Sequence, residues 1–235
     1  MKILITGGGC EEPIDNVRSI CNFSTGKTST FLSRFFLERG HDVTAVMANR
    51  AVKPEPLKDE PGTGKLHVIQ FKSFNDLQQT LREELERNGY DAVIHAAAVS
   101  DYSPYEIEAD GMTFKAGEIA KINSSSEITV KLKRNPKILD SIRSWSRKDI
   151  FLAGFKLTSN ADEAARKNAV WKIFDADTGC KAPDAVVSND LSEITEKSHP
   201  CRIYSPDGNF TDTENLQEMA EVLLEKMTAR TSCAR

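Results

Sequence analysis

The chain has few cysteines, no long apolar run and no excess of positive charge, and each shortage argues against a class of protein. The number of cysteines is odd, they are widely scattered, and no CxxC spacing occurs, which favours neither a disulfide framework nor a zinc site. No stretch approaches the roughly 18 apolar residues of a membrane span. The net charge of -4 argues against general nucleic-acid binding. The five cysteines are Cys10, Cys21, Cys180, Cys201 and Cys233.

The beginning of the chain lacks the features of a secretory signal. Met1 leads directly into the apolar run from Ile3 to Ile5, which glycines then end. This run is too short for the apolar region of a signal peptide, and no basic segment precedes it. We therefore expect a cytoplasmic protein with reduced thiols and with no membrane partner.

The composition is that of an ordinary globular protein. Hydrophobic residues make up 39% and charged residues 28% of the 235 positions, which is enough apolar material for a buried core. Sheet-and-helix enzymes of this size are routinely single units. We expect one domain over residues 1–235.

Strand and helix patterns alternate along the chain. Short apolar runs predict strands over Lys2–Thr6, Val43–Met47, His67–Phe71, Ala92–Ala98, Ile128–Leu132, Ile150–Leu157, Asp184–Val187 and, as a final edge strand, Cys201–Tyr204. Helical spacing predicts helices over Ser24–Arg39, Phe74–Asn88, Pro136–Trp145, Asp162–Phe174 and Glu214–Met227. This order predicts an α/β, Rossmann-like, three-layer fold with a mostly parallel central sheet.

Two segments break the alternation. The stretch from Lys53 to Lys65 contains three prolines and two glycines and predicts an exposed connection. The stretch from Asp101 to Ile119 has no clean period. We interpret residues 101–120 as a flap, or dimerisation extension, over the end of the preceding strand.

Gly7, Gly8 and Gly9 follow the first predicted strand, where parallel sheets bind ligands. The dinucleotide pattern G-x-G-x-x-G is not met, because Glu12 stands at its last position. A nicotinamide cofactor is therefore not expected. The later segment from Ser24 to Thr28 imitates the end of a P-loop, but no strand runs directly into it.

The segment between the glycines and Lys27 is rich in groups that bind anions. Arg18 can hold an oxyanion with two hydrogen bonds, Asn22 can donate to developing negative charge, and Lys27 can meet a phosphate. The four histidines form no HxxxH pattern and no cluster with cysteine, so no metal held by protein ligands alone is expected.

The run from Thr6 through Lys27 follows the pattern T-x-G-x-x-x-E-P-[IL]-D-x-V-R-x-I-x-N-x-S-[ST]-G-K without a gap. It closely resembles the opening motif of the phosphopantothenate–cysteine ligases, also called phosphopantothenoylcysteine synthetases. Further matches occur in family order over nearly the whole chain. They are Ala97–Tyr102, Lys121–Ile122, Asn135–Ile138, Gly154–Lys156 and Ser188–Asp190.

The resemblance implies a ligase of coenzyme A biosynthesis. The carboxylate of 4′-phosphopantothenate would attack the α-phosphate of CTP, giving an acyl-cytidylate and pyrophosphate, and the amine of cysteine would then displace CMP. Mg²⁺ would be held mainly by nucleotide phosphates. The likeness is to the stand-alone bacterial form without a flavin. It implies a homodimer and a possible association with a separate decarboxylase.

The resemblance also implies roles for individual residues. Asn22 and Lys121 would be catalytic. The residues that would bind the substrate and the intermediate are Gly8, Gly9, Arg18, Ser24, Gly26, Lys27 and Asn189. The nucleotide would contact Ala96, Ala97, Asp101, Lys121, Asn135, Pro136, Lys137, Ile138, Phe155, Lys167 and Lys172.

Several residues depart from the family pattern or have a simpler explanation. Lys172 is five residues after Lys167, although the family has a lysine pair four apart, and Trp171 occupies the expected position. Cys10 replaces the usual threonine, and residues 123–125 replace a lysine-rich stretch. Asn22 could instead be a helix cap, and Phe155 a core residue. Eukaryotic relatives use ATP, which remains the alternative to CTP.

Two other functions fit parts of the sequence. A short-chain oxidoreductase shares the glycine loop and the alternating elements, but none of the four tyrosines has a lysine four residues later. A non-catalytic nucleotide-sensing module is expected to have lost Asn22 or Lys121, and both are present. The ligase is the function that accounts for the motif from Thr6 to Lys27 and for the further matches along the chain.

Overall fold

The chain is represented by a computed structural model that describes residues 1–58, 61–118, 120–123, 127–175, 182–195 and 198–233. The helices are α1 (Lys27–Leu37), α2 (Phe74–Arg87), α3 (Leu139–Trp145), α4 (Glu163–Phe174) and α5 (Leu216–Cys233). The first strands are β1 (Lys2–Gly7), β2 (Glu11–Pro13), β3 (Ser19–Cys21), β4 (Asp42–Ala48), β5 (Leu66–Phe71) and β6 (Ala92–His95). The remaining strands are β7 (Tyr102–Ala109), β8 (Met112–Lys115), β9 (Ile128–Arg134), β10 (Phe151–Thr158), β11 (Ala185–Asp190), β12 (Cys201–Tyr204) and β13 (Phe210–Thr213).

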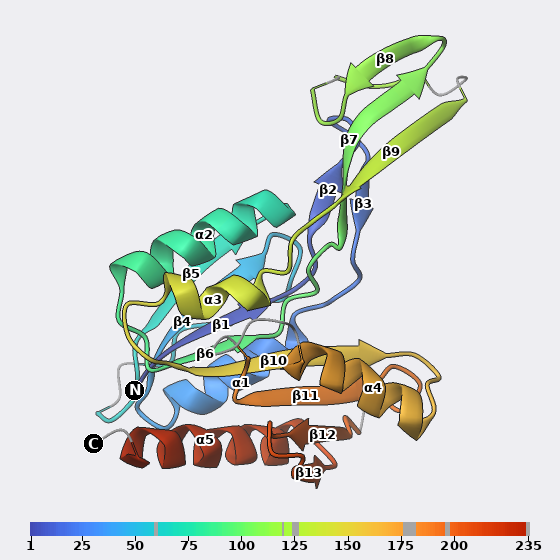
Figure 1. Ribbon diagram of the computed structural model, residues 1–235. Helices are drawn as coiled ribbons and strands as arrows, with labels where there is room; N and C mark the ends of the chain where they lie inside the picture. The colour runs from blue at the N-terminus through green and yellow to red at the C-terminus, as the bar shows by residue number, and fades with distance from the viewer. Residues whose placement is uncertain (59–60, 119, 124–126, 176–181, 196–197, 234–235) are drawn as a thin grey trace.

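A central sheet of eight strands runs in the order β13-β12-β11-β10-β6-β1-β4-β5 (Figure 1). The strands from β11 to β5 pair in parallel, whereas β12 and β13 are antiparallel. The central parallel strands β1, β4 and β6 are buried apolar runs, as expected when helices cover both faces of a sheet. The predicted α/β fold with a mostly parallel sheet is confirmed.

Helices lie on both faces of this sheet. Helices α1 and α5 contact each other, and so do α2 and α3 (Figure 1). Helix α2 shows why these segments are helical: Ser73 and Asp76 form a capping box at its start, and Leu77, Leu81 and Leu85 form its buried face. The layers bury one large apolar core around β1, β4 and β6.

The register of the sheet brings the carboxyl ends of its central strands to one edge. Thr6 of β1 pairs with Val46 of β4 and with His95 of β6, and His95 also pairs with Gly154 of β10. Ligands of open α/β sheets bind outside this edge. The loops that follow β1, β6 and β10 therefore border the expected ligand site.

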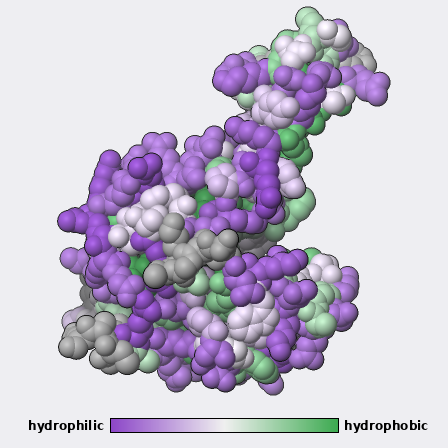
Figure 2. Space-filling model, in the orientation of Figure 1, coloured by the Kyte–Doolittle hydropathy of each residue, from purple (hydrophilic) through white to green (hydrophobic). Residues whose placement is uncertain are grey.

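A second, antiparallel sheet with the order β8-β7-β9 leaves the body after β6 and is here called the extension. It projects well beyond the central sheet (Figure 1), and apolar surface is visible along its neck and near its tip (Figure 2). Its small core contains Ile107, Ala109 and Ile122, against which Ile14 packs from the loop between β2 and β3. The extension therefore has an apolar core of its own.

Several boundaries differ from the predictions, among them the end of α5, which lies at Cys233 rather than at Met227, and the start of α3, which lies at Leu139 rather than at Pro136. Helix α1 begins at Lys27 rather than at Ser24, because Gly26 has a left-handed φ of 75° and cannot continue a helix backwards. Strand β6 ends at His95, after which the chain turns to pair Ala98 with Gly9. The sequence shows no regular hydrophobic period over residues 101–120, but most of these residues form β7 and β8. The sheet edge is β13, not Cys201–Tyr204.

The antiparallel hairpin of β2 and β3 was not predicted at all. Each of its strands has three residues, too few for a period of two to be visible, and Glu11, Glu12 and Pro13 are poor strand formers. Strand β13 was missed for a similar reason, since Phe210 is the only apolar residue in it. Both are held by pairing with partners that a local pattern does not show.

Two further observations concern membrane spans and thiols. No helix in the described ranges is long and apolar enough to cross a bilayer. Cys10, Cys21 and Cys201 are free thiols, as the scattered cysteines predicted. Cys180 lies outside the described residues.

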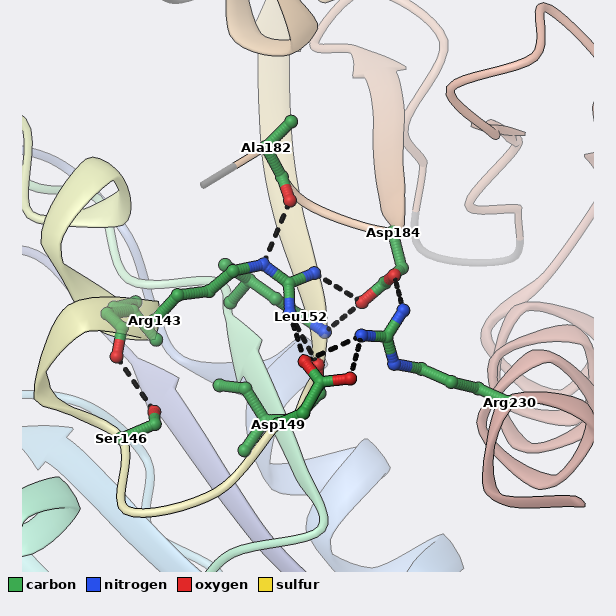
Figure 3. Close-up of polar contacts among 9 residues, drawn as sticks. Arg143, Ser146, Asp149, Leu152, Ala182, Asp184 and Arg230 are labelled. Carbon is green, nitrogen blue, oxygen red and sulfur yellow. Dashed lines mark hydrogen bonds and ion pairs between the residues drawn. The ribbon is translucent and has the colours of Figure 1, made fainter. Parts of the chain in front are cut away.

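A closed network of charges lies at the opposite, amino-terminal edge of the sheet (Figure 3). Arg143 of α3 donates to Asp184 Oδ2 at 2.6 Å and to the Ile150 carbonyl at 2.7 Å. Arg230 of α5 pairs with both Asp184 and Asp149. Because α3 and α5 belong to opposite faces, Asp184 joins both helix layers to the start of β11. The side chains of Arg143 and Asp184 are only 13% and 19% exposed.

Replacing Asp184 with alanine is expected to destabilise the fold strongly. The change would leave Arg143 largely buried without its main partner, which costs about 3 kcal/mol, equivalent to roughly 6–12 °C in Tm for a chain of this size. Thermal unfolding measures the effect. The control is Arg34→Ala, which removes an ion pair with Glu38 whose arginine is 71% exposed and which should cost under about 1 kcal/mol. Equal Tm values for the two variants would contradict the assigned role.

Candidate active site

The loops after β1 and β6 are joined by backbone hydrogen bonds beyond the end of the sheet. Ala98 N–H donates to the Gly8 carbonyl at 2.8 Å, and Cys10 N–H donates to the Ala98 carbonyl at 3.1 Å. The loop after β6 is therefore fixed against the glycine loop, and the two predicted motifs at these positions lie side by side.

Gly9 allows the end of the β2–β3 hairpin to approach the glycine loop closely. A Cβ at Gly9 would lie 1.8 Å from the carbonyl oxygen of Asn22, which no side chain can do. Asn22 N–H donates to the Cys10 carbonyl at 3.1 Å. Gly8 has a φ of +84°, and a Cβ there would meet the Cβ atoms of Ala48 and Ala51 at 2.6 and 2.7 Å. Both glycines thus have a packing role that needs no bound phosphate.

The side chain of Asn22 lies at the surface and is held by the loop after β6. Its Oδ1 accepts from the Ser100 hydroxyl at 3.0 Å, and its Nδ2 faces the Val99 carbonyl at 3.4 Å. Asn22 does not cap α1, whose N-cap residue is Gly26. The alternative interpretation of Asn22 as a helix cap is therefore wrong.

Asp101 and the Asn135–Ile138 segment also meet at this place. The Asp101 carboxylate forms an ion pair with Lys137, and its carbonyl accepts from Asn135 N–H at 2.8 Å. Lys137, Pro136 and Asp101 are exposed, whereas Asn135 and Ile138 are buried. The neighbouring Ala96 and Ala97 are half-buried. Most of the residues before position 140 that were predicted to bind the nucleotide therefore lie close together in space.

The start of α1 adds uncapped donors beside Asn22. Gly26 at the N-cap has no side chain to accept from the first turn, Lys27 is the first helical residue, and Ser24 is exposed. A helix start of this kind carries positive potential and free N–H groups, which favour an anion. Gly8, Gly9, Asn22, Ser24 and Lys27 are thus brought to one edge.

Arg18 and Lys121 lie farther out, where the hairpin meets the extension. Arg18 donates to the Ile122 carbonyl at 2.9 Å, and its Nη1 is buried without a hydrogen-bond partner among the described residues. Ile122 N–H donates to Asp15, which helps to hold the pKa of that carboxyl below its usual value. Lys121 is exposed next to Ile122. The departure from the family pattern at residues 123–125 lies mostly outside the described residues.

Arg18 directly precedes β3 and Asn22 directly follows it. At about 3.3 Å per residue, their Cα atoms are roughly 13 Å apart. None of the described contacts joins Lys121 to Asn22 or Asp101. The structure therefore groups the predicted site residues into an inner set around Asn22 and an outer set around Arg18 and Lys121.

The remaining predicted residues are on the strands and helix beyond β6. Phe155 of β10 is half-buried and packs against the main core, in line with its simpler interpretation. Asn189 of β11 lies beside His199, with Nδ2 and Nε2 3.2 Å apart. Lys167 and Lys172 are both exposed on α4, while Trp171 packs against Phe174. The structure does not bring these four residues into contact with Asn22.

His95 is a titratable side chain buried at the end of β6. Burial lowers the pKa of this imidazole to about 4, so it is neutral at pH 7. Its Nδ1 lies 3.0 Å from Thr6 Oγ1, which accepts from Ala97 N–H at 3.0 Å. Among the described residues, no group of three or more metal-binding side chains is placed to hold an ion.

Three buried polar residues beside the site were not singled out from the sequence. The Glu12 carboxylate accepts from Phe74 N–H and from the Ser103 hydroxyl, both at 2.7 Å. Asn135 Nδ2 donates to Ser103 Oγ at 2.8 Å and to the Ser100 carbonyl at 3.0 Å. Glu12, Ser100 and Ser103 lie within or beside the quoted motifs, but only burial distinguishes them from exposed polar residues.

Comparison with known proteins gives one family for almost the whole chain. The profile of the family described as "DNA/pantothenate metabolism flavoprotein C-terminal domain" matches residues 1–230. The coenzyme A biosynthesis bifunctional protein CoaBC of Methanocaldococcus jannaschii is 32% identical over 162 residues, which are 69% of this chain and 34% of that protein. The CoaBC protein of Escherichia coli (strain K12) is 23% identical over 98% of this chain and 52% of its own length. The chain thus spans about half or less of these curated relatives.

Solved structures extend the similarity to three dimensions. The DNA/pantothenate metabolism flavoprotein from Streptococcus pneumoniae has a TM-score of 0.82 and 31% identity, covering 98% of this chain and 99% of that one. A Cab2 mutant in complex with phosphopantothenate-cysteine has a TM-score of 0.70 and 20% identity, covering 98% and 88%. At that identity the second likeness concerns the fold alone.

Gly9→Ala is expected to displace the Asn22 segment and to destabilise the protein by roughly 2 kcal/mol or more, because the new methyl group would overlap a backbone carbonyl. The matched control is Gly89→Ala, where the nearest atom to an added Cβ is the Lys148 side chain at 3.8 Å. This control should change stability by no more than about 0.5 kcal/mol. Chemical denaturation measures the free energy of unfolding of both variants. A Gly9→Ala variant as stable as the wild type would show that the contact between Gly9 and the Asn22 carbonyl is not rigid.

Proposed function

Because the chain belongs to the family of the DNA/pantothenate metabolism flavoprotein C-terminal domain, we propose that it is a phosphopantothenate–cysteine ligase of coenzyme A biosynthesis. The observation that carries this proposal is the meeting of the glycine loop, Asn22, Asp101 and Lys137 at the carboxyl edge of β1 and β6. The family and its CoaBC relatives support the pathway, and the ligand of the Cab2 mutant supports the product.

In the first half-reaction, a carboxylate oxygen of 4′-phosphopantothenate forms a bond to the α-phosphorus of CTP, and the bond to pyrophosphate breaks. Both reactants are anions, so they must be brought together by positive charge. The start of α1, whose N-cap has no capping side chain, and Lys27 supply it. Mg²⁺ is proposed to enter on the nucleotide phosphates, which need few protein ligands.

In the second half-reaction, the amine of cysteine forms a bond to the acyl carbon, the bond to CMP breaks, and one proton is released. Negative charge develops on the acyl oxygen before CMP leaves. The exposed Asn22 amide is the proposed donor to that charge, because a fixed donor aimed at a developing oxyanion lowers the barrier. Lys121 and Arg18 would act from the outer set on the phosphates of nucleotide and substrate.

The preference for CTP over ATP, the stand-alone form and the association with a separate decarboxylase remain predictions from the resemblance. Assays of the purified chain with phosphopantothenate, cysteine and each nucleotide decide the first. Formation of phosphopantothenoylcysteine with CMP is the expected result. If no product forms with CTP and none forms with ATP, the proposed function is refuted.

Asn22→Asp is expected to keep the fold and to lower the rate of amide formation by about 100-fold or more, because the change removes the amide donor and adds a negative charge. The Ser100 hydroxyl can still donate to the new carboxylate, so Tm should change little. Product formation and thermal unfolding are measured on the same preparation. A variant with wild-type turnover would refute the assigned role of Asn22.

We also propose that the chain forms a homodimer through the extension. Its narrow antiparallel sheet exposes Met112, Leu132 and Tyr105 at 56%, 45% and 44%. A three-stranded sheet that stands off a body leaves apolar side chains in water unless another surface covers them. A second copy of this chain would supply that surface.

Met112→Lys is expected to shift the sedimentation coefficient at micromolar concentration from that of a dimer towards that of a single chain, because a charge would enter an apolar interface. The control is Leu191→Lys, which changes a side chain that is 57% exposed and far from the extension in sequence. A wild-type chain that sediments as a monomer at micromolar concentration would refute the proposed homodimer.

A further inference from the structure

The side chain of Asn22 has a defined orientation, although it lies at the surface. The two ends of its amide face different partners, the Val99 carbonyl and the Ser100 hydroxyl. A carbonyl oxygen only accepts, so the nitrogen Nδ2 must face Val99 and Oδ1 must face Ser100. The hydroxyl of Ser100 is therefore a donor to Asn22.

The stronger of these two contacts is the one to Ser100. The distance from Ser100 Oγ to Asn22 Oδ1 is 3.0 Å, whereas Asn22 Nδ2 is 3.4 Å from the Val99 carbonyl oxygen. At 3.4 Å the second contact is a weak hydrogen bond. Val99 thus selects which end of the amide turns towards it, and Ser100 fixes the position of the side chain. The second hydrogen of Nδ2 has no protein acceptor among the described residues.

Ser100 also lies beside the buried thiol of Cys10. Burial raises the pKa of this thiol to about 11, and interactions with the N–H and the hydroxyl of Ser100 offset part of the rise. Cys10 is therefore uncharged at neutral pH and adds no negative charge beside Asn22.

A second set of buried contacts fixes the backbone of Ser100. Its carbonyl accepts from Asn135 Nδ2 at 3.0 Å, and the same nitrogen donates to Ser103 Oγ at 2.8 Å. Ser103 donates in turn to the Glu12 carboxylate at 2.7 Å. Ser100, Ser103, Asn135 and Glu12 are all less than 9% exposed. Ser100 cannot shift without breaking buried hydrogen bonds.

We propose that Ser100 is a positioning residue for Asn22, which it holds so that the free amide hydrogen points at the acyl oxygen of the bound intermediate. This inference rests on the proposed ligase function and adds to it a buried residue that acts through Asn22. Partners that orient a functional group typically change activity by about 10- to 100-fold when they are removed, since a small displacement of a donor weakens its contact with the transition state.

The test compares Ser100→Ala with Ser100→Thr, which keeps the hydroxyl. The alanine variant is expected to lower kcat roughly 10-fold or more, with the KM values for nucleotide and phosphopantothenate unchanged, because the loss is confined to the transition state. Pyrophosphate release in the first turnover should be retained, so that the acyl-nucleotide intermediate accumulates. The threonine variant should recover most of the lost kcat.

Two further variants separate positioning from stability. Ser146→Ala removes a comparable serine hydroxyl, which donates to the Ile142 carbonyl at 2.8 Å at the opposite edge of the sheet, and it should leave kcat unchanged. If Ser100→Ala does not fold, Ser100→Cys fills similar space with a weaker donor and should show the same selective loss of kcat. All rates are measured well below the Tm of each variant.

The outcomes distinguish this inference from the proposed function. A wild-type chain that forms no product refutes the ligase proposal before Ser100 is considered. An active wild-type chain with an equally active Ser100→Ala variant refutes only the positioning role. Folded alanine and threonine variants that are equally slow also refute it, because the hydroxyl would then not be what matters, and so does a loss that appears only in KM.

Discussion

The contact between the Asn22 carbonyl and Gly9 is the constraint on which the geometry of the site depends. It is possible only without a side chain at Gly9, and the backbone hydrogen bond from Asn22 to Cys10 reinforces it. The end of the β2–β3 hairpin is thereby fixed to the end of β1. Helix α1 begins five residues later, so its first turn and the Asn22 side chain open onto the same edge of the sheet. The glycine loop acts here by letting protein backbone come close.

A buried carboxylate joins this hairpin to the rest of the molecule. Glu12 accepts hydrogen bonds from the first turn of α2 and from Ser103 at the base of the extension. Burying a carboxylate is costly unless its oxygens are satisfied, and the positive end of α2 offsets part of that cost. Body, hairpin and extension therefore meet at one polar centre, and hydrogen bonds through Ser103, Asn135 and Ser100 connect it to the Asn22 side chain.

The two edges of the central sheet have different tasks. At the amino edge, Arg143, Asp149, Asp184 and Arg230 satisfy one another and join the helix layers (Figure 3). At the carboxyl edge, one hydrogen of Asn22 Nδ2 has no protein acceptor among the described residues, and the N-cap residue of α1 offers no side-chain acceptor to the first turn. Charges that are paired hold the fold, whereas donors that are left open can serve a ligand. This division is what makes the carboxyl edge the candidate site.

The sequence alone determined the order of strands and helices in the body, since runs such as Ile3–Ile5 and the Leu77, Leu81, Leu85 spacing are local patterns with a fixed period. It also determined the family, because the motif from Thr6 to Lys27 is contiguous. The hairpin of β2 and β3, the edge strand β13 and the separation of Arg18 from Asn22 could not be predicted, because strand pairing joins residues without a local signal. Only the tertiary structure decided that Glu12, Ser100 and Ser103 are buried, and a polar residue acquires a fixed orientation only where burial removes water as its competing partner.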